Sequence, residues 1–414
     1  MKALFGFFSA AALLVFPSGV VVVDNASGLV ALIVVLSGLI TAATLKKRIF
    51  VLTREEKFFF FVMPLLLISA VITSIYNDTG LAKADRFSIF ILAIPVYIFF
   101  KFNTIKEKYI WSGLVAGSFI VLTVALYQMF GPVQQRPHGS VNAILFGDLA
   151  LLMGVMSLAG VGWFHQQGRW MVAIPFCAFI AGSAASALSM SRGGWLALPF
   201  LGLILAVYST RYLSCKKIAT ILALTVLFIG IVYLVPQTGV QGRLTLSVDE
   251  VEQYLVSTDV NDPARSNSIG TRLELWKAAW LIFTDNPVAG VGWGNLQPAS
   301  KVLVEEGLVN QRVLEFYHSH NQYLSALAKG GLLGFLSLSI LLCFPMLVFL
   351  KYSQVKYNDE VNRMAVAGLI LVAGFACFGF TEAILERSRG ISFYSFYLGI
   401  FMALILQHRQ NSNL

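Results

Sequence analysis

The sequence predicts an all-α polytopic integral membrane protein, with about twelve transmembrane helices and one large outward-facing loop that contains helices of its own. Hydrophobic residues make up 57% of the 414 residues and charged residues 12%, against about 45–50% and about 25% in soluble domains. Such a chain has too few polar groups to cover a water-facing surface. Its apolar runs are continuous and do not alternate, so the spanning elements are helices and not strands.

Twelve apolar runs are long enough to cross about 30 Å of hydrocarbon. They lie near residues 4–22, 27–45, 57–75, 88–101, 109–130, 142–164, 170–188, 194–209, 217–235, 322–350, 361–381 and 391–407. The fourth and eighth are short, and 322–350 is long enough to tilt or to begin outside the membrane. The runs divide the chain into residues 1–235 with nine spans, a connecting loop at 236–321, and residues 322–414 with three spans.

The distribution of Lys and Arg predicts which side each loop faces. With the N-terminus inside, the inner loops and ends carry 17 of these residues and the short outer loops carry 6. Basic residues collect on the cytoplasmic side, so both termini are predicted there and the loop 236–321 faces outward. The same bias explains the net charge of +9 through contact with anionic membrane lipids, and nucleic acid is not an expected partner.

The outward loop is predicted to contain helices at Val251–Tyr254 and at Thr271–Thr284. The second has an apolar stripe at helical spacing, formed by Leu273, Trp276, Trp280 and Phe283. Two tryptophans on one face suit a helix that lies at the membrane interface, and Asn286-Pro287 ends it. The glycine-rich segment 290–294 follows no parallel strand, so we interpret it as a turn or a packing element and not as a nucleotide-binding loop.

Arg192 stands in Ser191-Arg192-Gly193-Gly194-Trp195, at the outer mouth of a predicted span. An arginine near hydrocarbon costs about 2.5–3.5 kcal/mol at mid-helix and less at a helix end, where it can snorkel to the interface. A snorkelling end residue is therefore one interpretation. The adjacent glycines would let a ligand approach the backbone, and a guanidinium can bind phosphate oxygens in a bidentate manner.

Arg265 and Arg272 flank the predicted start of the second loop helix. An arginine at a helix N-terminus opposes the helix dipole, which gives it little structural purpose. Binding an anion beside the free N–H groups of the helix is better motivated. The alternative is plain surface charge.

His318-Ser319-His320-Asn321 closes the loop just before the tenth span and holds two of the chain's five histidines. A neutral imidazole is a natural general base near pH 7. A metal site is not expected, because Glu315 is the only nearby carboxylate in the sequence and no CxxC, HExxH or DxD pattern occurs.

These segments together resemble the O-antigen ligase and polymerase superfamily of bacterial inner-membrane proteins. The resemblance rests on 191–196, on Arg272–Trp276 with Asn286-Pro287 and 290–295, and on His320-Asn321 followed after nine residues by Gly331-Leu332-Leu333-Gly334. In the ligases, that last spacing is characteristic. The resemblance covers residues 190–335 by motif and the whole chain by span count.

The resemblance implies transfer of a polysaccharide from undecaprenyl diphosphate to lipid A–core at the periplasmic face of the inner membrane. It implies His320, Arg192 and Arg272 as catalytic residues, and Arg265, His318, Asn321 and Trp293 as substrate-binding residues. The arginines would hold the diphosphate leaving group, and His320 would take the proton of the acceptor hydroxyl or only orient the substrate. The expected reaction is a metal-independent, inverting glycosyl transfer without a cofactor.

Three alternatives remain open at this point. An O-antigen polymerase would use a second lipid-linked glycan as acceptor, and a protein O-oligosaccharyltransferase would use a protein hydroxyl. A transporter belongs to a different class, but transporters favour broken helices and charges at the midplane, whereas the candidate residues here gather at one face and in one loop.

Overall fold

In a computed structural model, the protein is described at residues 2–24, 28, 32, 35–41, 52–103, 105–132, 134–191, 193–209, 216, 230, 240–354 and 358–412. Within these ranges the regular elements are helices, and no strand occurs. The α-helices are α1 (Lys2–Val22), α3 (Arg54–Val62), α4 (Leu65–Tyr76), α5 (Ala93–Phe102), α6 (Lys108–Phe130), α7 (Ala143–Ala159), α8 (Val161–Gln167), α9 (Ala173–Leu188), α10 (Leu198–Ser209), α12 (Val240–Val256), α13 (Ser268–Asp285), α14 (Leu296–Glu305), α15 (Gln322–Tyr352), α16 (Asp359–Phe378) and α17 (Ser388–Ser412). Short 3-10 helices are η1 (Asp85–Leu92), η2 (Arg169–Val172), η3 (Gly193–Ala197), η5 (Pro263–Arg265), η6 (Gln311–Glu315) and η7 (Ile384–Glu386).

The helices support a multi-pass membrane protein. Among the described residues, six helical segments are long and apolar enough to cross a bilayer, and a seventh results if α7 and α8, bent by 53°, form one span. Shorter apolar helices lie at Ser9–Val22 and Gly193–Ser209. Most of the predicted second and ninth spans, 27–45 and 217–235, falls outside the described residues. The count of twelve therefore stays a prediction.

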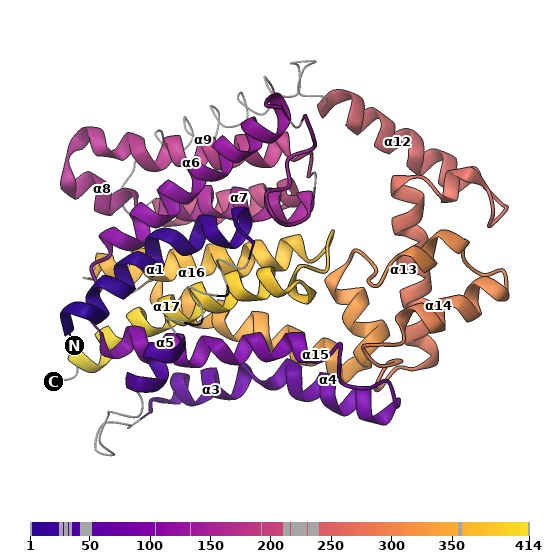
Figure 1. The fold of residues 1–414 in the computed structure, drawn as a ribbon, viewed down its shortest axis with the longest axis horizontal. Helices are drawn as coiled ribbons and strands as arrows, with labels where there is room; N and C mark the ends of the chain where they lie inside the picture. Colours follow the sequence, from indigo (N-terminus) through magenta and orange to yellow (C-terminus); the bar gives the residue numbers. More distant parts are fainter. Residues whose placement is uncertain are drawn as a thin grey trace.

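Helices α16 and α17 form the centre of the bundle, with 89% of each apolar segment buried inside the protein. Around them, α5 packs on α17, α7 and α15 pack on α16, and α9 and α6 pack on α7 further out. Figure 1 shows this arrangement, with α12, α13 and α14 gathered beyond one end of the bundle and both chain termini at the other end. The helices α12, α13 and α14 therefore form a separate group that joins the bundle at one end.

Ion pairs between loops follow the predicted alternation of sides. At one end, Lys351 pairs with Glu55 at 2.9 Å, and Arg363 pairs with Glu107 at 2.7 Å. All four residues lie in segments that the sequence assigns to the inner side. At the other end, contacts join segments that it assigns to the outer side: Arg389 to Asp24, and Arg86 to the Glu386 carbonyl. Which end faces the periplasm stays a prediction.

The outer helices confirm the predicted loop helices and extend them. The residues 251–254 lie in α12, and 271–284 lie in α13, which ends at Asp285 before Asn286 as predicted. The face of α13 that packs inside the protein is formed by Leu275, Ala278, Ala279 and Ile282. The predicted aromatic stripe lies outside this core, and Trp280 is 52% exposed. The other three residues of the stripe are half-buried, so Trp280 is the one that suits contact with the membrane interface.

Helix α15 is broken at Gly331, whose φ of 59° and ψ of −154° are not helical. The segment that follows α13 supplies the hydrogen bonds that the break would otherwise lose: the N–H groups of Val291 and Gly292 donate to the carbonyls of Ala328 and Lys329, and the N–H of Leu332 donates to the carbonyl of Pro287. A Cβ on Gly331 would lie 2.4 Å from the Val288 backbone. Segment 290–294 is therefore a packing element, as predicted, and it joins the outer helices to the bundle.

Candidate functional site

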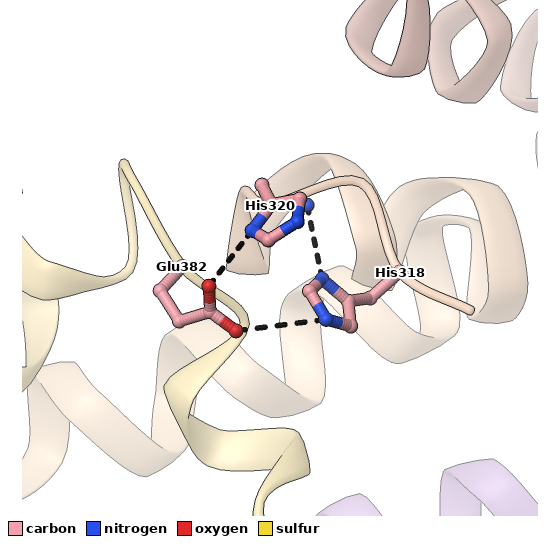
Figure 2. Close-up of side chains that lie close together, drawn as sticks. All are labelled: His318, His320 and Glu382. Carbon is pink, nitrogen blue, oxygen red and sulfur yellow. Dashed lines mark hydrogen bonds and ion pairs between the residues drawn. The ribbon is translucent and has the colours of Figure 1, made fainter. Parts of the chain in front are cut away.

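The site is centred on His320 and Glu382, which come from two different loops at the outer end of the bundle (Figure 2). His320 precedes α15, and Glu382 lies in the turn between α16 and η7. The Nδ1 atom of His320 lies 2.8 Å from Oε2 of Glu382. Because an ionised carboxylate only accepts hydrogen bonds, Nδ1 carries the proton and donates it. A neutral His320 then has a free lone pair on Nε2.

Backbone geometry holds His320 in place. Its φ of 50° is in the left-handed region, which a residue with a Cβ adopts only when the surroundings enforce it. The next residue, Asn321, is the N-cap of α15, and its Oδ1 accepts from the N–H groups of Tyr323 and Leu324. The amide of Asn321 also donates to the carbonyl of Phe380, two residues before Glu382. Asn321 therefore ties both loops together.

Glu382 is fully buried, yet its surroundings keep it ionised. Burial of the carboxyl raises its pKa, but the hydrogen bond from His320 and the positive groups around it outweigh this effect and lower the pKa to about 2. Arg387 is one of these groups, with its NH2 atom 3.1 Å from Oε1 of Glu382. The carboxylate is thus a permanent negative charge beside the imidazole of His320.

His318 lies on the other side of the carboxylate and stays neutral. Burial lowers its pKa to about 4, although the charge of Glu382 acts in the opposite direction. Its Nδ1 faces the N–H of His320 at 3.2 Å, and its Nε2 faces the Arg387 guanidinium at 2.9 Å. A neutral imidazole has one acceptor nitrogen, so only one of these contacts is a hydrogen bond at a time. Nε2 of His318 also lies 3.6 Å from Oε1 of Glu382.

The segment that carries Arg192 packs directly against the loop of Glu382. Arg192 itself lies outside the described residues. Of its neighbours, Gly193 lies so close to Thr381 that a Cβ would be 2.2 Å from Oγ1, and a Cβ on Gly194 would be 2.6 Å from Oδ1 of the buried Asp148. Side chains of the protein, and not an open space for a ligand, thus account for these two glycines.

Arg272 and Arg265 have different surroundings. Helix α13 begins at Ser268, so Arg272 lies in its second turn and not at its N-terminus. Within the described part of the chain, no hydrogen bond or ion pair engages the Arg272 guanidinium, and Asp148 lies within electrostatic range of both Arg272 and Glu382. Arg272 and Glu382 therefore both lie near the buried Asp148.

Arg265 is held by the outer helices themselves. Its NH1 atom lies 2.9 Å from Oε1 of the buried Glu274, its NH2 donates to the carbonyl of Ser257, and the ring of Tyr254 covers it. These contacts tie η5 to α12 and α13. A substrate-binding role for Arg265 stays a prediction, and these contacts give it a structural role as well.

Trp293, predicted as a substrate-binding residue, is buried at the junction between the outer helices and α15. Its ring meets Phe87 edge-on at 4.5 Å, and the ammonium of Lys329 lies 5.7 Å from its centre. Its indole N–H has no hydrogen-bond partner among the described residues. The residue is therefore buried with a free donor, and its predicted role in substrate binding stays a prediction.

His318, His320 and Glu382 also form a set of ligand atoms that lie within 4.8 Å of one another. Two histidines and a carboxylate are a plausible set for a divalent cation. However, the Arg387 guanidinium lies 2.9 Å from His318 and 3.1 Å from Glu382, so a metal ion shared by these two residues would have to displace it.

Sequence reasoning missed Glu382 and Arg387 as site residues. Arg387 contributed only to the count of basic residues on the outer side. A signal was present: 381–389 places two acidic and two basic residues in one short outer connection between apolar spans. Charged groups at such a position need partners, which the histidines of the other loop provide.

Comparison with known proteins bears on the central part of the chain. Residues 177–339 match the family model described as O-antigen ligase. The chain is also 26% identical over 326 residues to a protein of Haemophilus influenzae described as uncharacterized, an alignment that covers 78% of this chain and 80% of the relative. The matched segment includes both histidines and the predicted arginines, whereas Glu382 and Arg387 lie beyond it. Residues 177–339 are thus similar to the O-antigen ligase family.

Proposed function

We propose that the protein is an O-antigen ligase, a glycosyltransferase that moves a polysaccharide from undecaprenyl diphosphate to a sugar hydroxyl of lipid A–core. The reaction takes place at the periplasmic face of the bacterial inner membrane. The similarity of residues 177–339 to the O-antigen ligase family supports this class of reaction, and the single observation that carries the mechanism is the hydrogen bond of 2.8 Å between His320 and Glu382. Lipid A–core is the acceptor in this proposal, in preference to a second lipid-linked glycan or a protein hydroxyl.

His320 is the general base. Its Nδ1–H is held by Glu382, so Nε2 takes the proton of the acceptor hydroxyl while the acceptor oxygen bonds to the anomeric carbon. The bond from that carbon to the diphosphate oxygen breaks in the same displacement, which inverts the anomeric configuration. The buried negative charge of Glu382 stabilises the imidazolium that forms, as the carboxylate of a catalytic triad does.

The diphosphate leaving group gains negative charge as the bond breaks, and cations placed there lower the barrier. Arg272 supplies such a cation with an unpaired guanidinium, and we assign the same role to Arg192 and, more peripherally, to Arg265. These arginines provide charge without a divalent cation. Arg387 supports a metal-independent reaction, because its guanidinium lies between the carboxylate and His318, where a metal ion would bind.

The experiment is transfer in vitro, with the purified full-length protein, a lipid-diphosphate-linked polysaccharide and lipid A–core. His320→Ala is expected to abolish transfer at an unchanged protein level in the membrane, and Arg192→Lys, which keeps the charge but loses the planar fork, is expected to lose most of it. Full activity of His320→Ala would overturn the general base. No product with lipid A–core, together with product on a peptide or on a second lipid-linked glycan, would reassign the acceptor.

A further inference from the structure

The outer end of the protein has a polar cleft, called the outer cleft, which the proposed mechanism does not use. It is lined by Lys83, Arg86, Trp293, Tyr317, Lys329 and Glu386, among others, and its enclosed space is about 30 Å³. That space holds a group about the size of a water molecule, such as one hydroxyl of a larger ligand that lies at the mouth. Tyr317 adjoins His318, and Glu386 adjoins Arg387. The lining of the outer cleft is therefore continuous in sequence with both loops of the histidine site.

Two polar atoms of the outer cleft are buried without a partner among the described residues. They are the indole Nε1 of Trp293 and Oε1 of Glu386, and the two residues are 5% and 6% exposed. The other oxygen of Glu386 accepts from Lys329 at 2.6 Å. Leaving a buried polar group unpaired costs about 1–3 kcal/mol, so a buried donor and a buried acceptor on two residues that line one cleft point to a ligand that can supply both. A sugar hydroxyl does, because it accepts from an indole N–H and donates to a carboxylate.

The mouth of the outer cleft is cationic. Lys329 and Glu386 neutralise each other, which leaves Lys83 and Arg86 as excess positive charge. One guanidinium nitrogen of Arg86 donates to the carbonyl of Glu386 at 3.0 Å, and this contact aims the guanidinium at the cleft. The ammonium of Lys83 lies over the ring of Tyr317, 5.4 Å from its centre. An exposed lysine and a half-buried arginine next to hydroxyl-binding groups suit a phosphate or carboxylate carried on a sugar.

We propose that the outer cleft is a subsite for an anionic sugar, phosphorylated or carboxylated, of one of the two glycans that meet at His320. The inference rests on the proposed function for the identity of those glycans. The sugar places a hydroxyl between Trp293 and Glu386 and its anionic group against Arg86 and Lys83. Such a subsite orients the glycan relative to the base without taking part in bond making.

Binding without chemistry tests this proposal. The probes are the phosphorylated core oligosaccharide freed from lipid A, the same oligosaccharide after enzymatic dephosphorylation, and the glycan released from the carrier lipid. The purified full-length protein in detergent is titrated with each, and Kd is measured by microscale thermophoresis. We expect one of the two native glycans to bind, with Kd at least tenfold weaker for Arg86→Gln and Lys83→Gln. Trp293→Phe, which keeps the ring and removes the N–H, is expected to weaken binding about fivefold.

Two controls make the result specific. Lys301→Gln removes one positive charge from an exposed position on α14 that does not line the cleft, and its Kd should equal that of the unmodified protein. His320→Ala should bind the probe normally while it fails in transfer. Failure of the subsite is therefore visible as unchanged Kd values in the cleft variants, whereas failure of the proposed function is visible as transfer by His320→Ala.

The outcomes either identify the glycan that occupies the outer cleft or overturn the proposal. Loss of affinity in the cleft variants for the core oligosaccharide identifies the acceptor as the occupant, and loss for the released glycan identifies the donor. The anionic subsite would be overturned if the phosphorylated and dephosphorylated core bound with equal Kd and if Arg86→Gln left the Kd of the released glycan unchanged. So would the absence of binding of all three probes, or an equal effect of Lys301→Gln.

Discussion

Glu382 holds the Nδ1 atom of His320 at 2.8 Å across 62 residues of sequence. The carboxylate is fully buried and its pKa is lowered to about 2, so it is ionised at every physiological pH. This relationship fixes which nitrogen of His320 carries the proton and leaves the other nitrogen without a proton. It is the same relation that a carboxylate has to the histidine of a hydrolase triad, here placed at the outer end of a membrane-spanning bundle.

Glu382→Gln keeps the shape of the side chain but removes its charge. The imidazolium that forms during transfer then loses its stabilisation, so we expect kcat to fall by about 10²–10⁴-fold with KM values within about threefold of the unmodified protein. Steady-state transfer kinetics measure both. Glu305→Gln, at an exposed position on α14, is the matched control and should be fully active. A parallel rise in KM without loss of kcat would show that Glu382 acts in binding instead.

Arg387→Ala removes the cation that lies between His318 and Glu382. The three possible ligands for a metal ion are then unobstructed, and we expect Zn²⁺ to inhibit this variant at a concentration at least tenfold lower than it inhibits the unmodified protein. Transfer by the unmodified protein should continue in excess EDTA. Loss of its activity in EDTA and recovery on addition of Mg²⁺ would contradict the metal-independent mechanism.

His318 makes the stability of the protein depend on pH. Its pKa in the folded state is about 4, below the usual value of about 6.5, so the unfolded chain takes up a proton at higher pH than the folded one. The stability that follows from this difference is fully present above about pH 6.5 and is lost as pH falls towards 4. Between pH 7 and pH 5 the loss is about 2 kcal/mol.

His318→Asn removes this titration, because an asparagine does not ionise in this range. The decrease in Tm between pH 7 and pH 5, measured in detergent by a thiol-reactive dye or by tryptophan fluorescence, should therefore be smaller in the variant. An equal decrease in both proteins would show that His318 is not the group responsible.

Gly331→Ala tests the break in α15. The new Cβ would lie 2.4 Å from the Val288 backbone at a φ of 59°, so strain and overlap add up, and we expect a loss of about 3 kcal/mol or more. Gly307 also has a positive φ, of 69°, but has nothing within 4 Å of the position of a Cβ. Gly307→Ala should therefore cost only about 1 kcal/mol. Equal decreases in Tm for the two variants would argue against close packing of Gly331 on the Val288 backbone.

Much of the fold follows from the sequence because hydropathy and loop charge act locally along the chain. The helix at Thr271–Thr284, its end before Asn286-Pro287, and the packing role of segment 290–294 were all predictable from local patterns. The unusual length of 322–350 also had a physical meaning, since the helix there is interrupted at Gly331. The buried face of α13 was harder to predict from the sequence, because it depends on how α14 and the start of α15 pack against it.

The site was predictable only in its histidine half. His318 and His320 stand together in sequence and attract notice, whereas Glu382 and Arg387 reach them through the folding of α15 and α16 against each other. The same holds for the outer cleft, which combines residues from the segment before α5, the outer helices and η7. Tertiary contacts of this kind leave no periodic trace in one sequence.

The most direct test of the central claim is to delete the gene, restore it with the unmodified sequence or with His320→Ala, and examine lipopolysaccharide on a silver-stained gel beside a blot of carrier-linked polysaccharide. We expect the long-chain ladder to vanish in the deletion and in the His320→Ala strain, while polymerised glycan accumulates on the carrier lipid, and to return with the unmodified sequence. A core that carries a single repeat unit would indicate a polymerase, and a full ladder in the His320→Ala strain would contradict the account.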